Sequence, residues 1–280
     1  MPVNESSLFI TDQYRDRAGL ISEEGGAQIE SGFEELVSWT DIDGGFDRFA
    51  IFAAASIGGF QAQQTILADS YLASYVTNEL GTRVAPQGIS TANYSLTDQF
   101  GRSIRRALEP AVYTFKLGIL KNVAVPIAQK LGSARARRIA TTMIAHSGRE
   151  AMKDLMVASP YIEGWIRVPR ASACGACLAL SDGRVHEPEE AFRGHPNCHC
   201  VQEPVLVGDR GSISRPTGKE IFDQKTKAEQ DALFEGRGGE RKADLIRGGL
   251  PLSELVNELP MKLGGAPMVS EKPLTDLISS

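Results

Sequence analysis

The stretch Cys174-Gly-Ala-Cys177, followed by His195-Pro-Asn-Cys198-His199-Cys200, holds every cysteine of the 280-residue chain. Two tight sulfur clusters joined by a linker short enough for a hairpin are what a single thiolate metal site or a local disulfide clip requires. The N-terminus lacks the basic start and apolar core of a signal peptide, so we expect a reducing cytoplasm, where this pattern is more often a metal site. We therefore predict zinc, with a disulfide clip and free thiols as the alternatives.

A tetrahedral zinc needs four ligands, so the second cluster must supply two, and it offers three candidates with His199 as a poorer fourth. The candidate ligands are Cys174, Cys177, His195, Cys198 and Cys200. A set of four cysteines uses every sulfur, whereas a set with His195 and Cys198 keeps the usual two-residue gap and leaves Cys200 spare. Either set fills all four positions with protein and leaves none for a catalytic water. The predicted zinc is therefore structural, and it would support a small β unit that has little core of its own.

The rest of the pattern predicts a mainly α protein of the α+β class, with long N-terminal helices, a short β-hairpin insert and short C-terminal helices. Glu23-Glu24-Gly25-Gly26 suggests a break before the first helix, and apolar residues at three- and four-residue steps predict a helix over 133–158. Strands are expected at 164–168, 183–186 and 201–206. The expected divisions are an N-terminal arm (1–26), a helical domain (27–158), a Cys/His β-rich motif (159–207), a short helical module (208–260) and a flexible tail (261–280).

Helix boundaries follow from glycine and proline. A long helix over about 46–80 should end at Gly81, with a possible kink at Gly58-Gly59, and a loop should follow to about residue 97. Helices are then expected over 98–122 and on to residue 131, limited by Pro110 and Pro126. In the C-terminal module, short helices are expected at 219–222, 225–234, 240–247 and 252–259, before a mobile tail.

Composition limits the partners. The chain is 42% apolar and 23% charged with a net charge of -5, which is typical of a globular protein and argues against broad neutralisation of nucleic-acid phosphates. Two arginine runs, Arg102, Arg105, Arg106 and Arg135, Arg137, Arg138, are interpreted as solvated helix faces. The charge-free stretch 49–68 contains glutamines and glycines, so we expect a buried helix and no membrane partner.

The cysteine window resembles the C-terminal signature of the Mu F-like minor head proteins of tailed bacteriophages, most closely the branch found in phages of actinobacteria. The matching residues are Gly164-Trp-Ile-Arg-Val168, Ala173-Cys174-Gly-Ala-Cys177-Leu-Ala-Leu180, Gly183-Arg184 and Gly194-His-Pro-Asn-Cys-His-Cys200. The segments 219–234 and 243–257 resemble the short helical module that follows this signature in relatives. Thr141-Thr142 stands where many relatives carry an arginine followed by Thr or Ser, so no role of that arginine is transferred.

The resemblance implies a minor capsid protein that acts in head morphogenesis at or near the portal. Its expected partners are the portal protein, the major capsid protein and packaged DNA, and its expected location is the virion, at the capsid interior or portal vertex, after assembly in the host cytoplasm. Related proteins are sometimes described as capsid maturation proteases. A protease therefore stays as an alternative, and a zinc-stapled nuclease or a DNA-associated ejected protein as further ones.

The residues themselves favour a structural role over an enzymatic one. A serine protease needs a histidine base beside its nucleophile. The chain has only His146, His186, His195 and His199, and three of them crowd the cysteine window. A Gly-x-Ser-x-Gly elbow is absent, and a cysteine nucleophile would compete with metal binding. We name no catalytic or cofactor-binding residue.

Overall fold

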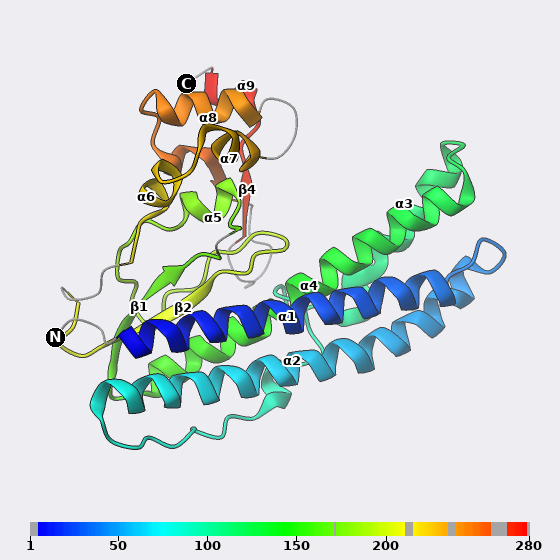
Figure 1. Cartoon of the computed structure of the whole chain (residues 1–280). Coiled ribbons are helices and arrows are strands. Elements are labelled where there is room, and N and C mark those ends of the chain that lie inside the picture. The colour runs from blue at the N-terminus through cyan, green and yellow to red at the C-terminus, as the bar shows by residue number, and fades with distance from the viewer. Residues whose placement is uncertain (1–4, 171, 211–214, 235–238, 259–267, 279–280) are drawn as a thin grey trace.

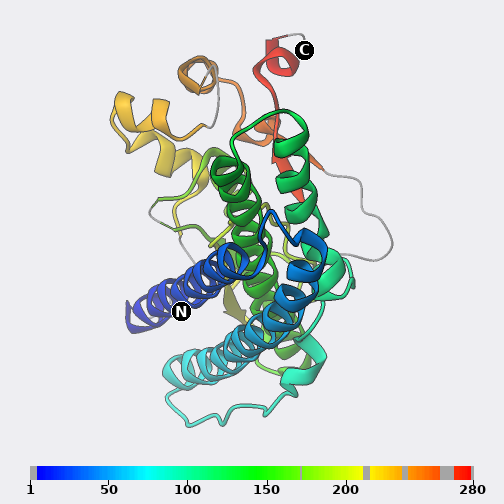
Figure 2. The ribbon, with the colours of Figure 1, turned by 90° about the vertical axis from the view of Figure 1, so that its right-hand side faces the viewer.

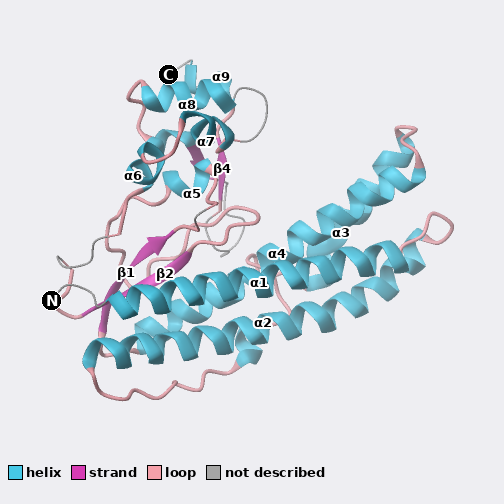
Figure 3. Cartoon of the chain, in the orientation of Figure 1, coloured by secondary structure: helices cyan, strands magenta, loops and turns pink. Residues whose placement is uncertain are grey.

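The computed structural model describes residues 5–170, 172–210, 215–234, 239–258 and 268–278. Long helices form a bundle, a small sheet lies against one side of it, and a group of short C-terminal helices lies beyond the sheet (Figures 1 and 3). The long helices are α1 (Glu5–Leu36), α2 (Ile42–Leu80), α3 (Ile104–Leu120) and α4 (Val125–Ala158). In the view turned by 90°, the C-terminal helices again lie apart from α2 (Figure 2). The predicted fold class, mainly α with a small β component, is confirmed.

Helix α1 corrects the predicted break at Glu23–Gly26. The helix runs without interruption through Gly25 and Gly26, so residues 5–26 belong to the bundle. A Cβ atom on Gly25 would lie 2.4 Å from Ile144 Cδ1 and 2.9 Å from the Phe60 ring. These glycines therefore let α1 approach α2 and α4 closely, a packing role that outweighs their low helix propensity.

Helices α2 and α4 follow the glycine and proline signals, whereas α3 continues through Pro110, which was expected to limit or bend it. Helix α2 ends at Gly81, which has the predicted left-handed conformation with φ of 64°. Helix α4 begins at Val125 with Pro126 in its first turn, where the missing N–H costs nothing. Helix α4 continues unbroken to Ala158, so the predicted interruption between residues 131 and 133 is wrong. The expected loop from 81 to 97 is present and contains a 3-10 turn, η1 (Thr91–Tyr94).

The β unit is smaller than predicted. Strands β1 (Ile162–Val168) and β2 (Val201–Leu206) form a two-stranded antiparallel sheet. The expected strand at 183–186 contributes only an isolated bridge, in which His186 exchanges backbone hydrogen bonds with Trp165. Between the strands lies a short helix that was not predicted, α5 (Gly175–Ala179).

The C-terminal module contains the short helices α6 (Gly218–Asp223), α7 (Lys227–Ala232) and α8 (Gly239–Arg247) as expected. The predicted helix at 252–259 is instead a 3-10 turn, η2 (Leu252–Leu255), followed by strand β3 (Val256–Glu258). Strand β3 pairs with β4 (Val269–Glu271), and α9 (Leu274–Ile278) follows. The described part of the predicted flexible tail is therefore ordered secondary structure, whereas residues 259–267 and 279–280 lie outside the described residues.

Two apolar cores hold these parts together. One is formed by the four long helices, and in it the rings of Phe49 and Phe115 each meet the Phe33 ring edge to face. The other joins the near ends of the long helices to the sheet, to α5 and to the C-terminal module, and it includes Cys177, Cys198 and Cys200. The cysteine window therefore lies inside a core that the helical region, the sheet and the module share.

A buried ion pair also ties β2 to the bundle. The Glu203 carboxylate is fully buried and accepts hydrogen bonds from Arg215 Nε at 2.7 Å and Thr11 Oγ1 at 3.1 Å. Burial raises the pKa of Glu203 despite the opposing effect of Arg215. Thr11 Oγ1 lies 2.8 Å from the Tyr71 hydroxyl, so the network joins α1, α2 and β2. Among the described helices, none combines the length and the apolarity that crossing a membrane requires.

Gly25→Ala is predicted to destabilise the protein by about 1–3 kcal/mol, because the added methyl overpacks the contact between the helices. Gly59→Ala is the matched control, since a Cβ there meets nothing within 4 Å, and it should stabilise α2 by about 0.5–1 kcal/mol. Urea unfolding monitored by circular dichroism measures both changes. An unchanged or raised midpoint for Gly25→Ala would contradict the close packing of α1.

Candidate metal centre

The segment His195-Pro196-Asn197-Cys198 forms a tight turn that brings two candidate ligands together. Cys198 N–H donates to the His195 carbonyl at 3.1 Å, and Asn197 has a left-handed φ of 61°. Proline at the second position and a residue with positive φ at the third are typical of a type II turn. The local sequence therefore explains why the side chains of His195 and Cys198 approach the same region.

The Cys174–Cys177 pair lies at the start of helix α5. Cys174 is the N-cap residue and Cys177 lies within the helix, so one helical turn brings the two sulfurs together. A hydrogen bond to the C-terminal module holds α5 in place: Gly175 N–H donates to the Leu233 carbonyl at 3.0 Å. A Cβ on Gly175 would lie 2.4 Å from the Phe234 ring. The C-terminal module thus sets the position of the first sulfur pair.

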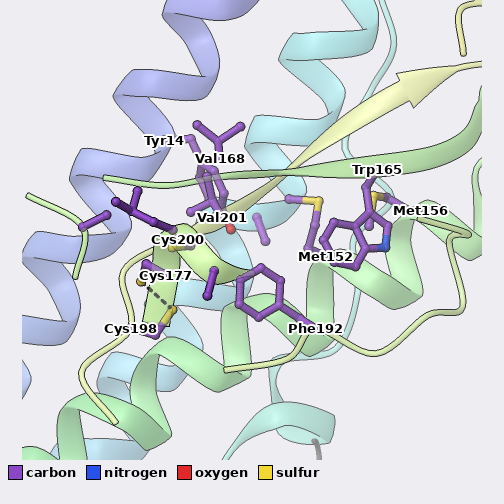
Figure 4. Close-up of a cluster of buried hydrophobic side chains, with 14 of the residues drawn as sticks. Tyr14, Met152, Met156, Trp165, Val168, Cys177, Phe192, Cys198, Cys200 and Val201 are labelled. Carbon is purple, nitrogen blue, oxygen red and sulfur yellow. Dashed lines mark hydrogen bonds between the residues drawn. The ribbon is translucent and has the colours of Figure 1, made fainter. Parts of the chain in front are cut away.

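All five predicted ligands converge, and Cys177 lies at the centre of the group. The ligand atoms of Cys174, Cys177 and His195 lie within 4.8 Å of one another, as do those of Cys177, Cys198 and Cys200. Cys177 Sγ is 2.9 Å from His195 Nε2 and 3.8 Å from Cys198 Sγ; the latter contact is the dashed line in Figure 4. None of the four cysteines forms a disulfide, so the disulfide clip, one of the predicted alternatives, is not present among them. The cluster is compatible with a metal site.

The orientation of His195 suits metal ligation. Its Nδ1 lies 2.8 Å from the Pro196 carbonyl, which accepts a hydrogen bond from an Nδ1–H. That hydrogen bond favours the tautomer whose Nε2 lone pair is free, and Nε2 is the atom that faces Cys174 and Cys177. His199 points elsewhere, because its Nε2 lies 3.6 Å from the Glu23 carboxylate on α1. Its exclusion from the predicted ligand set agrees with this geometry.

Protons are shared unevenly among these groups. The single S–H proton of Cys177 is shared between Cys174 and Cys198. Hydrogen bonding to Cys177 lowers the pKa of Cys174 to about 4 and, together with hydrogen bonding to Cys200, lowers the pKa of Cys198 well below its ordinary value. The pKa of Cys177 itself is raised, chiefly because its proton is held in the bond to Cys174. Burial lowers the pKa of His195, but hydrogen bonds to Cys174 and Cys198 outweigh it and raise the value to about 10. Because a metal binds thiolates and neutral imidazole, its binding here would release protons.

Two buried arginines flank the cluster, and the sequence prediction did not include them. Arg149 on α4 donates to the carbonyl oxygens of Cys198 and Cys200, and Arg167 on β1 donates to the Arg193 carbonyl. Both guanidinium groups lie over the Phe192 ring, at 4.5 Å and 3.9 Å from its centroid. Within the described residues, neither forms an ion pair with a carboxylate. Hydrogen bonding to Cys177 and Cys200 lowers the pKa of Cys198, and the positive charge of Arg149 adds to this effect. The hydrogen bond to Cys177 and the charge of Arg167 lower the pKa of Cys200, but the hydrogen bond to Cys198 and burial outweigh them and raise that pKa to about 12.

This arrangement balances charge inside the core. A divalent cation with four thiolates carries a net charge of about -2, and with three thiolates and a histidine about -1. A buried charge is stable only when it is compensated. Arg149 and Arg167 supply positive charge next to the sulfur atoms, where a thiolate complex needs it.

A cavity of about 120 Å³ reaches the cluster from outside. Its wall includes the two least buried ligands, Cys174 and His195, together with Arg170 and Pro196. Cys198 and Cys200 are each 1% exposed. A metal ion could therefore enter on the Cys174 side, while the Cys198 side remains closed by the core.

The two remaining histidines belong to other surroundings. His146 on α4 is in neither ligand group, and burial lowers its pKa to about 4, so its imidazole is neutral at pH 7. His186 stacks on Trp165 with ring centroids 4.1 Å apart, and its Nδ1 lies 2.9 Å from the Glu190 carboxylate. Stacking on Trp165 and the contact with Glu190 account for the position of His186.

Comparison of the chain with protein-family models, curated proteins and solved structures found no match.

Arg149→Met should weaken metal binding about 10- to 100-fold, the range typical when an outer-shell partner of a metal ligand is lost. The substitution removes the hydrogen bonds to the Cys198 and Cys200 carbonyls and one compensating charge. Arg170→Met is the matched control, because Arg170 pairs with Glu23 on the surface of the same region. Competition for Zn²⁺ against a chromophoric chelator measures the affinity. Equal affinities in the two variants would contradict the compensating role of Arg149.

Proposed function

We propose that the five-residue cluster holds one structural zinc ion and that the chain is a minor head protein of a tailed bacteriophage. The observation that carries the proposal is the closed Cys/His cluster at the junction of the bundle, the sheet and the C-terminal module. Its sequence is also the part of the chain that resembles the Mu F-like signature.

The donor set supports zinc over other common metals. Thiolate and imidazole ligands suit Zn²⁺, whereas Mg²⁺ and Ca²⁺ prefer oxygen. Two thiolates bound to a tetrahedral zinc at 2.3 Å each are separated by about 3.8 Å. The Cys177 and Cys198 sulfurs are 3.8 Å apart. Cys174 and Cys177 would hold the ion from α5, and two of His195, Cys198 and Cys200 would hold it from the second cluster.

A zinc ion here would cross-link segments of the chain that are separate in sequence. Five candidate ligands compete for four positions, so a bound water would have to displace a protein ligand. The ion would fasten α5 to the start of β2, and through the Gly175–Leu233 hydrogen bond it would also fix the C-terminal module. Arg149 links the same point to α4. These contacts favour a rigid assembly protein whose long helical bundle is held against a compact module.

Zinc content should identify the fourth ligand. We expect one zinc ion per chain in the purified protein, lost in one of the variants His195→Ala and Cys200→Ser and retained in the other. Loss in His195→Ala alone would assign the histidine set, and loss in Cys200→Ser alone would assign the four-cysteine set. Elemental analysis provides the measurement. Absence of any metal from protein prepared without chelators would contradict the zinc proposal.

Chelation should disrupt the apolar core that contains Cys177, Cys198 and Cys200, because structural zinc contributes on the order of 10 kcal/mol of apparent binding free energy. We expect a strong chelator to abolish the near-ultraviolet signal of Trp165, which is buried next to the cluster, and to increase proteolysis of the C-terminal module. His146→Ala, on α4 and outside the ligand groups, is the control and should keep the zinc dependence. Unfolding that is indifferent to chelator would show that apolar packing alone holds this junction.

The head-protein proposal is tested by assembly. Co-expression with the portal and major capsid proteins of the phage that encodes this chain should give particles that contain the chain, and loss of the zinc site should remove it from them. Failure of the intact chain to join particles would contradict the proposal. Cleavage of the major capsid protein by the purified chain, lost when a single histidine is substituted, would instead establish the protease alternative.

A further inference from the structure

The two arginine runs of the sequence converge on one cleft. Arg102 precedes α3, whereas Arg135 and Arg138 lie on α4, yet all three line a cavity of about 510 Å³. Thr142, Pro196 and Met268 complete part of its wall, so the cleft lies between the bundle and the loop that carries His195. The remaining arginines of these runs are not in the lining. Arg105 pairs with Asp47 and Arg137 with Glu30.

The cleft carries positive charge that the described residues do not neutralise. Arg102 is held by Asp98, with Nε to Oδ2 at 2.7 Å and Nη2 to Oδ2 at 2.6 Å. Arg135 donates only to the Thr114 hydroxyl, at 3.3 Å, and neither Arg135 nor Arg138 forms an ion pair with a described carboxylate. Counting Asp98, the cleft therefore has a net charge of +2. Both unpaired arginines are exposed and accessible to a ligand.

The charge of the surrounding hairpin extends beyond the cleft. Residues 102–138 contain nine lysines or arginines and one acidic residue, Glu109, for a net charge of +8. Because the whole chain is at -5, all other residues together carry -13. Lys121, like Arg135 and Arg138, has no described carboxylate partner. Five of the nine pair with carboxylates outside this range: Arg102 with Asp98, Arg105 with Asp47, Lys116 with Asp43, Lys130 with Glu34 and Arg137 with Glu30. The four without a described carboxylate partner, Arg106, Lys121, Arg135 and Arg138, outnumber Glu109, and this excess on one hairpin favours an extended anion over a small one.

We infer that this cleft binds phosphate groups of a nucleic-acid backbone. Guanidinium groups form forked hydrogen bonds that match phosphate oxygens, and they remain charged at any physiological pH. The Arg102–Asp98 pair, which precedes α3, borders the two free guanidinium groups of α4, so a phosphate would meet guanidinium donors from both segments. The contacts read charge and spacing, and binding is independent of base sequence.

The decisive measurement is the salt dependence of DNA binding by the full chain. Fluorescence anisotropy with a labelled DNA duplex should give a linear plot of log affinity against log salt. Arg135→Gln and Arg138→Gln should each weaken binding and each reduce the magnitude of the slope by about 0.9, the value for one phosphate contact. Arg137→Gln is the matched control: it removes the same charge from the same helix, but Arg137 is paired with Glu30, so its slope should stay unchanged.

Further arms distinguish other ligands. Inorganic phosphate and poly-glutamate are titrated against the chain alone and in competition with the duplex. Absence of DNA binding, equal slopes in Arg137→Gln and Arg138→Gln, or phosphate binding without DNA binding would each overturn the inference. Tighter binding of poly-glutamate than of DNA would overturn it in favour of an acidic protein. Thermal melting of each variant checks that the exposed substitutions leave the fold intact.

Discussion

The structure depends on a buried cluster of sulfur atoms whose negative charge must be balanced inside the core. Cys198 and Cys200 are almost completely buried, and the Arg149 guanidinium bonds to their backbone carbonyls from α4. A thiolate at Cys198 in such surroundings needs compensating positive charge and hydrogen-bond donors nearby, and Arg149 provides positive charge there. The same contacts join the end of the bundle to β2, so the balance of charge and the connection between the two parts are one requirement.

The sequence could predict the ligands because their geometry is local. A Cys-x-x-Cys pair at a helix start and a His-Pro-Asn-Cys turn each fix two side chains within four residues, and spacing alone reveals them. Arg149 could not be found in this way, because it is 49 residues from Cys198 and its role arises from tertiary packing. An arginine on the apolar face of a predicted helix, near Met152, was the available signal.

The errors in the predicted elements also have physical causes. Gly25 and Gly26 signal a break when only propensity is considered, but in α1 they permit close approach to α4. Residues 252–258 have helical composition, yet Val256 and its neighbours pair with β4, a strand more than ten residues away in sequence. Long-range pairing of this kind overrides local preference. The fold class was predictable, whereas the register of helices and the small second sheet required tertiary contacts.

The turn 195–198, which presents two candidate ligands, lies next to the cleft that Arg102, Arg135 and Arg138 line. Asn197 N–H donates to Thr142 Oγ1 at 3.3 Å, and Pro196 lines the cleft directly. Asn197 and Pro196 lie between His195 and Cys198, the two candidate ligands that the turn presents. A metal that fixes this turn would therefore also fix the part of the cleft wall that Pro196 contributes, whereas Arg135 and Arg138 line the cleft from α4. Two exposed guanidinium groups without a described carboxylate partner, next to a fixed turn, suit a backbone whose phosphates are regularly spaced but whose local shape varies.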